Sequence, residues 1–283
     1  MTAYGISGNP ESGAGRCPRH PDEVSYILCQ RCGSPVCARC QRPAPVGVRC
    51  PDCDKAFRAT APRARTKAGA VLGRSTKPVI THTVVGICVA VYLLGWVFPV
   101  HYGAYVPILT VAQPWRILTS AFLHADGIHL LLNMMGLWML GQALEPVLGR
   151  LRFALLYLLS ALGGAAALVA WSLVTPQALL QPVVGASGAI FGLLGALFVL
   201  SRAANADVRS LLVLIGLNVV YGFVVPGIAW QAHLGGLLIG ALATWVMVWA
   251  HRHRHPGLAY VALAVIAVLL GGFMYAGVTS LLM

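Results

Sequence analysis

The sequence predicts an all-α protein with several membrane-spanning helices, preceded by a small metal-binding module. Three observations support this prediction. The 283 residues are 58% hydrophobic and only 10% charged, a balance that places most of the chain in lipid rather than in water. From residue 79 onward the chain is a series of apolar runs of about spanning length. Seven of the eight cysteines lie between Cys17 and Cys53, ahead of the first run.

The cysteines predict a metal site because they come in pairs separated by two residues. The pairs are Cys17 with His20, Cys29 with Cys32, Cys37 with Cys40, and Cys50 with Cys53. Two ligands at this spacing can hold one tetrahedral ion, so four pairs fill two zinc sites. A disulfide knot is the alternative. Zinc is favoured because the number of cysteines in this segment is odd and His20 takes the place of a cysteine in the first pair. The first 75 residues show no secretory signal pattern, so we expect this segment in the reducing cytoplasm, where disulfides rarely persist.

These features divide the chain into four segments. We expect residues 1–16 to be disordered, residues 17–54 to form the zinc module, residues 55–78 to be a basic flexible linker, and residues 79–283 to form the membrane domain. The remaining cysteine, Cys88, lies in an apolar run, where we interpret it as a small core residue.

Seven apolar runs are expected to cross the membrane. They lie near residues 80–98, 127–147, 152–174, 187–203, 208–225, 232–250 and 258–282. Basic residues concentrate in the amino-terminal part and in alternate loops, whereas the loops at 175–186 and 226–231 carry no charge. The positive-inside rule therefore predicts a cytoplasmic amino terminus and an external carboxyl terminus in the cell membrane. The same distribution explains the net charge of +12 without nucleic acid, which we do not expect as a partner.

Ser187 opens the fourth apolar run, where it is either a helix cap or a reactive group. Ionisable side chains within a membrane usually mark function, and His124, His129 and His233 are the histidines at the starts of such runs. The topology puts Ser187, His129 and His233 at one depth near the outer surface. A histidine can act as the base that activates a serine. No acid falls next to His233, so the sequence predicts a dyad.

Two further patterns support this site. Gly188 with Gly192, and Gly236 with Gly240, have the spacing that lets helices pack closely, although ordinary packing alone would explain them. His129 and Asn133 are four residues apart on one helix face, where they could donate to an oxyanion.

Several separated motifs resemble those of the rhomboid intramembrane serine proteases. They are "WR" at 115–116, "HADGIHLLLNM" at 124–134, "GASG" at 185–188 and "AHLGG" at 232–236. The resemblance spans residue 80 to the end and implies six core transmembrane helices plus a seventh at the carboxyl end. It implies Ser187 as nucleophile, His233 as base, and His129 and Asn133 as oxyanion donors, with Ala186, His124 and Phe191 in support. The same resemblance implies structural roles for Trp115, Arg116 and Glu145, and catalysis without a cofactor.

The resemblance implies an endopeptidase that cuts single-span transmembrane proteins near the outer surface. A membrane-binding protein or chaperone that keeps the fold without the chemistry is the alternative, and a transporter would require ionisable residues at mid-bilayer instead. The cysteine-rich segment resembles B-box and related cross-brace zinc fingers. That resemblance implies one ion held by Cys17, His20, Cys37 and Cys40 and another by Cys29, Cys32, Cys50 and Cys53, in a module that could bind a protein partner.

Overall fold

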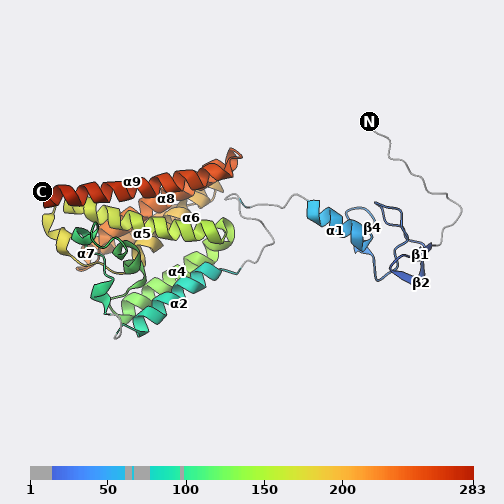
Figure 1. Cartoon of the computed structure of the whole chain (residues 1–283), viewed down its shortest axis with the longest axis horizontal. Coiled ribbons are helices and arrows are strands. Elements are labelled where there is room, and N and C mark those ends of the chain that lie inside the picture. The colour runs from blue at the N-terminus through green and yellow to red at the C-terminus, as the bar shows by residue number, and fades with distance from the viewer. Residues whose placement is uncertain (1–14, 61–65, 67–76, 96–98) are drawn as a thin grey trace. The chain divides into compact units, whose positions relative to one another are not determined.

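The computed structural model describes residues 15–60, 66, 77–95 and 99–283, which form parts of two compact units, residues 1–63 and 64–283 (Figure 1). The segment expected to be disordered lies outside the described residues except for its last two, which are in a β-strand. Most of the expected linker also lies outside them. Its first six residues, 55–60, belong to a helix instead.

The first unit is built from two short hairpins and one helix. Strand β1 (Gly15–Cys17) pairs antiparallel with β2 (His20–Ser25), β3 (Arg42–Pro43) pairs antiparallel with β4 (Val48–Arg49), and α1 (Pro51–Thr60) follows. Val36 and four of the cysteines form its small buried core. A core of this size cannot stabilise a domain by apolar burial alone, and a bound metal would supply the missing stability.

Among its described residues the second unit contains seven helices of at least 15 residues, which confirms the predicted all-α membrane architecture. They are α2 (Val79–Leu93), α4 (Gly127–Leu148), α5 (Arg150–Ser172), α6 (Ser187–Ala203), α7 (Arg209–Val224), α8 (Trp230–Arg252) and α9 (Pro256–Leu282). Among the described residues, α4, α5, α8 and α9 are long and apolar enough to cross a membrane, and the other three are shorter apolar helices. Their bounds lie within a few residues of most of the expected runs.

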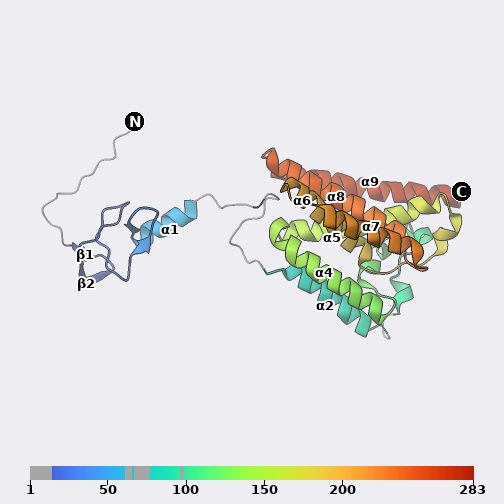
Figure 2. The same cartoon turned by 180° about the vertical axis from the view of Figure 1, so that it is seen from behind.

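Helix α6 lies at the centre of this bundle. Its nine consecutive residues from Gly188 to Ala196 are buried, mainly against α5 and α8. Helix α4 also contacts α6, α2 packs on α4, and α9 packs on α5 and α8. The two views accordingly show α2 and α9 at opposite edges (Figures 1 and 2). Helix α7 packs mainly on α8 and buries one residue, Gly222.

The segment between α2 and α4 forms short helical turns. These are η1 (Val100–Tyr102), η2 (Pro107–Leu109), α3 (Arg116–Thr119) and η3 (Ser120–Phe122), and a further turn, η4 (Pro176–Leu180), precedes α6. The backbone of Tyr105 exchanges two hydrogen bonds with Val183, at 2.9 and 2.8 Å. The segment between α2 and α4 therefore supports the backbone that leads into α6.

Candidate active site

Ser187 and His233 lie side by side although they are 46 positions apart in the sequence. The Oγ atom of Ser187 is 2.8 Å from Nε2 of His233, a normal hydrogen-bond distance. Ser187 is the first residue of α6 and His233 lies in the first turn of α8. The two helices begin at the same end of the bundle, which brings the two side chains together.

The hydroxyl of Ser187 does not cap its own helix. The N-cap of α6 is Ala186, and no side chain there accepts a hydrogen bond from the first turn. The first N–H groups of a helix have no partner within the helix. These groups therefore point toward the space beside Ser187 and are available to an anion.

Four glycines set the separation of α6 and α8. A Cβ atom on Gly236 would lie 1.9 Å from the carbonyl oxygen of Gly188, and one on Gly240 would lie 2.2 Å from that of Gly192. A Cβ on Gly192 would in turn lie 2.0 Å from Oγ of Ser160 on α5. No side chain fits at these positions, so α6 and α8 pack backbone to backbone, and the Ser160 side chain of α5 occupies the space beside Gly192.

The side chains on α4 reach the same region. Oδ1 of Asp126 accepts a hydrogen bond from the N–H of His129 at 2.8 Å and so caps α4. Nδ2 of Asn133 donates to the carbonyl oxygen of His129 at 2.8 Å, one turn further along. The ring of His124, which is buried, lies edge-on to that of His129 with centroids 5.3 Å apart.

Gly185 is a residue of the site that we did not single out from the sequence, although it begins the motif that contains Ser187. It has a φ of 127°, and a Cβ atom there would lie 2.8 Å from Nε2 of His129 and 3.7 Å from Oγ of Ser187. Its N–H donates to the carbonyl oxygen of Ser120 at 2.9 Å. Only glycine allows this backbone to pass between the two side chains.

The ring of His233 is held from one face by Phe191. Their centroids are 4.2 Å apart and their planes are 8° from parallel, so the rings are stacked. Nδ1 of His233 is buried and has no hydrogen-bond partner among the described residues. The geometry is therefore that of a serine–histidine pair without a carboxylate on the second ring nitrogen.

A cavity of about 830 Å³ opens beside this pair. Ser187, His233, His129 and Asn133 all line it. Its other walls come from α4, α5 and α7, from residues 182–185 before α6, and from the segment after α7. The cavity is large enough for a stretch of peptide.

Trp115 and Arg116, both expected to have structural roles, differ in their burial and in their hydrogen bonds. Arg116 is buried, and its Nη1 donates to the carbonyl oxygens of His101 at 2.6 Å and Ala104 at 2.9 Å. Its Nε also bonds to the side chain of Gln113. Trp115 is exposed. Arg116 thus holds together the segment that supports the approach to Ser187.

Glu145 is buried at the far end of α4 from the cavity. Its carboxylate accepts hydrogen bonds from the N–H groups of Ile80 and Thr81, both at 2.9 Å, and from the Thr81 hydroxyl at 2.7 Å. These donors belong to the first turn of α2, whose N-cap Pro78 has no side-chain cap. Glu145 therefore supplies the missing cap from a neighbouring helix and fixes α2 on α4.

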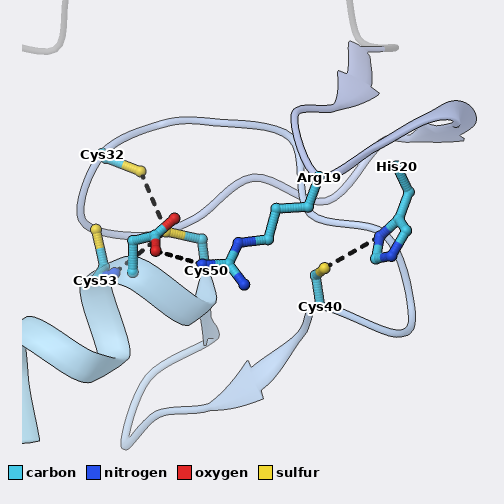
Figure 3. Close-up of polar contacts among 7 residues, drawn as sticks. Arg19, His20, Cys32, Cys40, Cys50 and Cys53 are labelled. Atoms are coloured by element: carbon cyan, nitrogen blue, oxygen red, sulfur yellow. Dashed lines mark hydrogen bonds and ion pairs between the residues drawn. The ribbon is translucent and has the colours of Figure 1, made fainter.

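The first unit groups its eight metal-ligand candidates into two sets, in the alternating pairing that the resemblance implies. One set is Cys17, His20, Cys37 and Cys40, and the other is Cys29, Cys32, Cys50 and Cys53. The ligand atoms of each set lie within 4.8 Å of one another. Figure 3 shows His20 with Cys40 from the first set and Cys50 with Cys32 and Cys53 from the second, together with Arg19, which pairs with Asp52 of α1.

The distances in both sets fit a tetrahedral zinc ion. With Zn–S bonds of about 2.3 Å, neighbouring ligand atoms lie about 3.8 Å apart. The Sγ atoms of Cys32 and Cys50 are 3.7 Å apart, and Nδ1 of His20 is 3.3 Å from Sγ of Cys40. All eight cysteines of the chain are free thiols. A hydrogen bond from the Cys37 backbone is the main cause that lowers the pKa of Cys17 to about 6, whereas burial raises the pKa of Cys37 to about 11.

The fold and the site together define a class: a multi-pass helical membrane protein with a serine–histidine pair beside a cavity. A family model described as the Rhomboid domain matches residues 111–250. The putative rhomboid protease YdcA of Bacillus subtilis is 34% identical over 146 residues, which cover 50% of this chain and 71% of that protein. The chain belongs to the rhomboid family.

Longer relatives match over part of their length. Rhomboid protease GluP of Bacillus subtilis is 36% identical over 173 residues, which cover 59% of this chain and 32% of that protein. RHOMBOID-like protein 4 of Arabidopsis thaliana is 33% identical over 159 residues, which cover 51% of this chain and 38% of that protein. The chain therefore spans about a third of the length of these two curated relatives.

Proposed function

We propose that this protein is an intramembrane serine endopeptidase that uses Ser187 and His233 as a catalytic dyad. The observation that carries the proposal is the 2.8 Å separation of Oγ and Nε2 at the edge of a cavity within the helical bundle. The similarity to named rhomboid proteases supports the same reaction. An unactivated serine is a weak nucleophile, and a histidine at this distance is the base that it needs.

The reaction follows from the positions of the groups. Nε2 of His233 takes the proton from Ser187 as Oγ attacks the scissile carbonyl carbon. The oxyanion then forms near the free N–H groups at the start of α6, with the side chains of His129 and Asn133 as further donors. His233 returns the proton to the leaving amine, and water later hydrolyses the acyl-enzyme by the same route.

Phe191 supports the base in this scheme. Its stacked ring keeps the His233 imidazole in one plane, because the buried Nδ1 has no hydrogen bond to orient it among the described residues. The face of an aromatic ring also attracts a cation, which stabilises the imidazolium that forms during proton transfer.

We propose single-span transmembrane proteins as substrates. A peptide bond inside a helix is not accessible to a nucleophile, so the cut segment carries small or helix-breaking residues. The cut lies near the outer surface if basic loops mark the cytoplasmic side. Helix α7 and the segment that follows it then act as the gate, since α7 buries only one residue and the segment lines the cavity.

The zinc module is assigned a structural role, with two zinc ions and no part in catalysis.

The non-catalytic alternative, a rhomboid-like membrane binder or chaperone, has no need of a paired serine and histidine. The retained pair therefore favours the protease.

The test is labelling of the purified full chain with a fluorophosphonate, together with cleavage of a fluorescent transmembrane substrate. Ser187→Ala and His233→Ala should each fold and lose essentially all cleavage, on the order of a millionfold, and the double variant should be little worse because the pair acts as one unit. Asn133→Ala should lose less, since other oxyanion donors remain.

Ser172→Ala is the matched control, because this buried serine on α5 bonds only to the carbonyl oxygen of Leu168 in its own helix. It should label and cleave like the wild type. Equal turnover by Ser187→Ala and wild type would contradict the protease proposal and would favour the non-catalytic membrane binder or chaperone.

A further inference from the structure

The cavity beside Ser187 has two walls of different chemistry. On α4 the lining residues Leu132, Met135 and Met139 are apolar, and each is more than half exposed. On α7 the lining residues Leu214, Asn218 and Tyr221, followed by the C-cap residue Val225, recur at the spacing of one helical face. Two of these four are polar, in a helix that is otherwise almost entirely apolar.

The two polar groups on α7 have unused hydrogen-bonding capacity. Nδ2 of Asn218 donates to the carbonyl oxygen of Leu214 at 2.8 Å. Asn218 makes no other hydrogen bond with the described residues, so its Oδ1 and its second N–H remain available. The Tyr221 hydroxyl has no hydrogen-bond partner among the described residues, and 58% of the residue's surface is exposed.

A polar group at membrane depth is costly unless something satisfies it. Lipid tails cannot donate or accept hydrogen bonds. On the α4 wall Leu132, Met135 and Met139 are apolar, and the polar lining residues His129 and Asn133 make no hydrogen bond with Asn218 or Tyr221. The occupant that suits the α7 wall is therefore one that brings polar groups into the cavity.

A substrate segment that has left its helix brings such groups. To be cut it must present an extended peptide bond to Ser187, and the neighbouring N–H and C=O groups then lose their partners within the helix. An amide side chain can accept a hydrogen bond from a backbone N–H group and donate one to a backbone C=O group, and a phenol hydroxyl can do the same.

We propose that Asn218 and Tyr221 form a binding site for the unwound backbone of the substrate, while the leucine and methionine wall of α4 receives its apolar side chains. This inference rests on the proposed protease function and names the residues that accept the extended segment. Backbone recognition is independent of side-chain identity, and methionine adapts to different shapes. The site therefore selects for segments that unwind readily rather than for one sequence.

The decisive experiment removes one hydrogen-bonding group from the enzyme and one from the substrate. Wild type, Asn218→Leu and Tyr221→Phe are compared in liposomes on a synthetic single-span substrate and on versions with one backbone amide near the cut replaced by an ester. We expect each variant to raise KM by about two- to tenfold, the range for a neutral hydrogen bond. The rate of fluorophosphonate labelling should not change.

The ester series identifies the contact. For wild type, the ester at one position should raise KM. For the variant that has lost the matching side chain, the same ester should have no further effect, because the two changes remove the same interaction. Asn218→Gln should recover part of the loss. Val213→Leu, an exposed residue of α7 that does not line the cavity, serves as the control and should match wild type.

The outcomes separate this proposal from the proposed function. Wild type that neither labels nor cleaves overturns both. Normal labelling and cleavage with unchanged KM in Asn218→Leu and Tyr221→Phe overturns the backbone site alone. Loss of labelling in step with loss of cleavage also overturns it, because the residues would then be supporting the fold.

Discussion

Gly236 and Gly188 meet at the point where α8 crosses α6, and a Cβ atom on Gly236 would lie 1.9 Å from the Gly188 carbonyl oxygen. Gly188 follows Ser187 directly, and Gly236 lies one turn after His233. The absence of two side chains therefore sets the distance between the proposed nucleophile and its base.

The first prediction is that Gly236→Ala reduces activity and stability together. The added methyl group meets backbone atoms, which cannot rotate away, so α6 and α8 must separate near Ser187 and His233. Overpacking of this kind costs about 1–3 kcal/mol or more in unfolding free energy. Thermal unfolding in detergent and fluorophosphonate labelling measure the two effects.

Gly271→Ala is the control, since nothing lies within 4 Å of a Cβ atom at that position on α9. It should retain full labelling and should be at least as stable as wild type, because alanine favours a helix over glycine. Equal labelling by Gly236→Ala and wild type would contradict the proposed role of the glycine contact.

The second prediction concerns Glu145. Glu145→Gln leaves one oxygen where two accept three hydrogen bonds from α2, and it turns an amide NH₂ group toward their donors. We expect a loss of about 1–3 kcal/mol in unfolding free energy with near-normal labelling at low temperature, since the residue is at the other end of α4 from the cavity.

Asp207→Asn makes the same chemical change at an exposed residue whose carboxylate bonds to the N–H of Arg209. It should lower the unfolding temperature much less. Equal unfolding temperatures for Glu145→Gln and wild type would show that the cap contributes nothing measurable.

The third prediction is that the purified full chain carries about two zinc ions, because eight ligands fill two tetrahedral sites. Metal analysis should show fewer ions in Cys37→Ser, which removes a ligand of the first set, and two ions in Cys88→Ser, whose thiol lies in α2. Deletion of residues 1–60 should remove the zinc and preserve cleavage. Reduced protein without zinc would refute the metal assignment.

The fourth prediction is that the two termini lie on opposite sides of the membrane, as seven spans require. A reporter that is active only in the cytoplasm should be silent when fused after Met283. The same reporter fused after His255, in the basic loop between α8 and α9, should be active. A bright signal from the Met283 fusion would mean that one of the seven helices does not cross.

Local sequence was sufficient for the seven apolar helices of the second unit and for the ligand candidates. Apolar runs of spanning length predicted the seven helices, because burial in lipid demands such runs whatever the topology. The pairs of ligands two residues apart between Cys17 and Cys53 predicted metal sites, because the spacing of two ligands within one turn is a local property of the sequence. Ser187 and His233 were proposed as site residues from their positions, since polar residues are conspicuous at the starts of apolar runs.

The tertiary structure decided what no local pattern contains. It showed that Ser187 does not cap its helix, that Gly185 passes between His129 and Ser187, and that Glu145 caps a helix more than sixty residues away. Each of these depends on where two distant backbones meet. Sequence spacing determines which side chains share a helix face, but the approach of one helix to another depends on the packing of every residue between them.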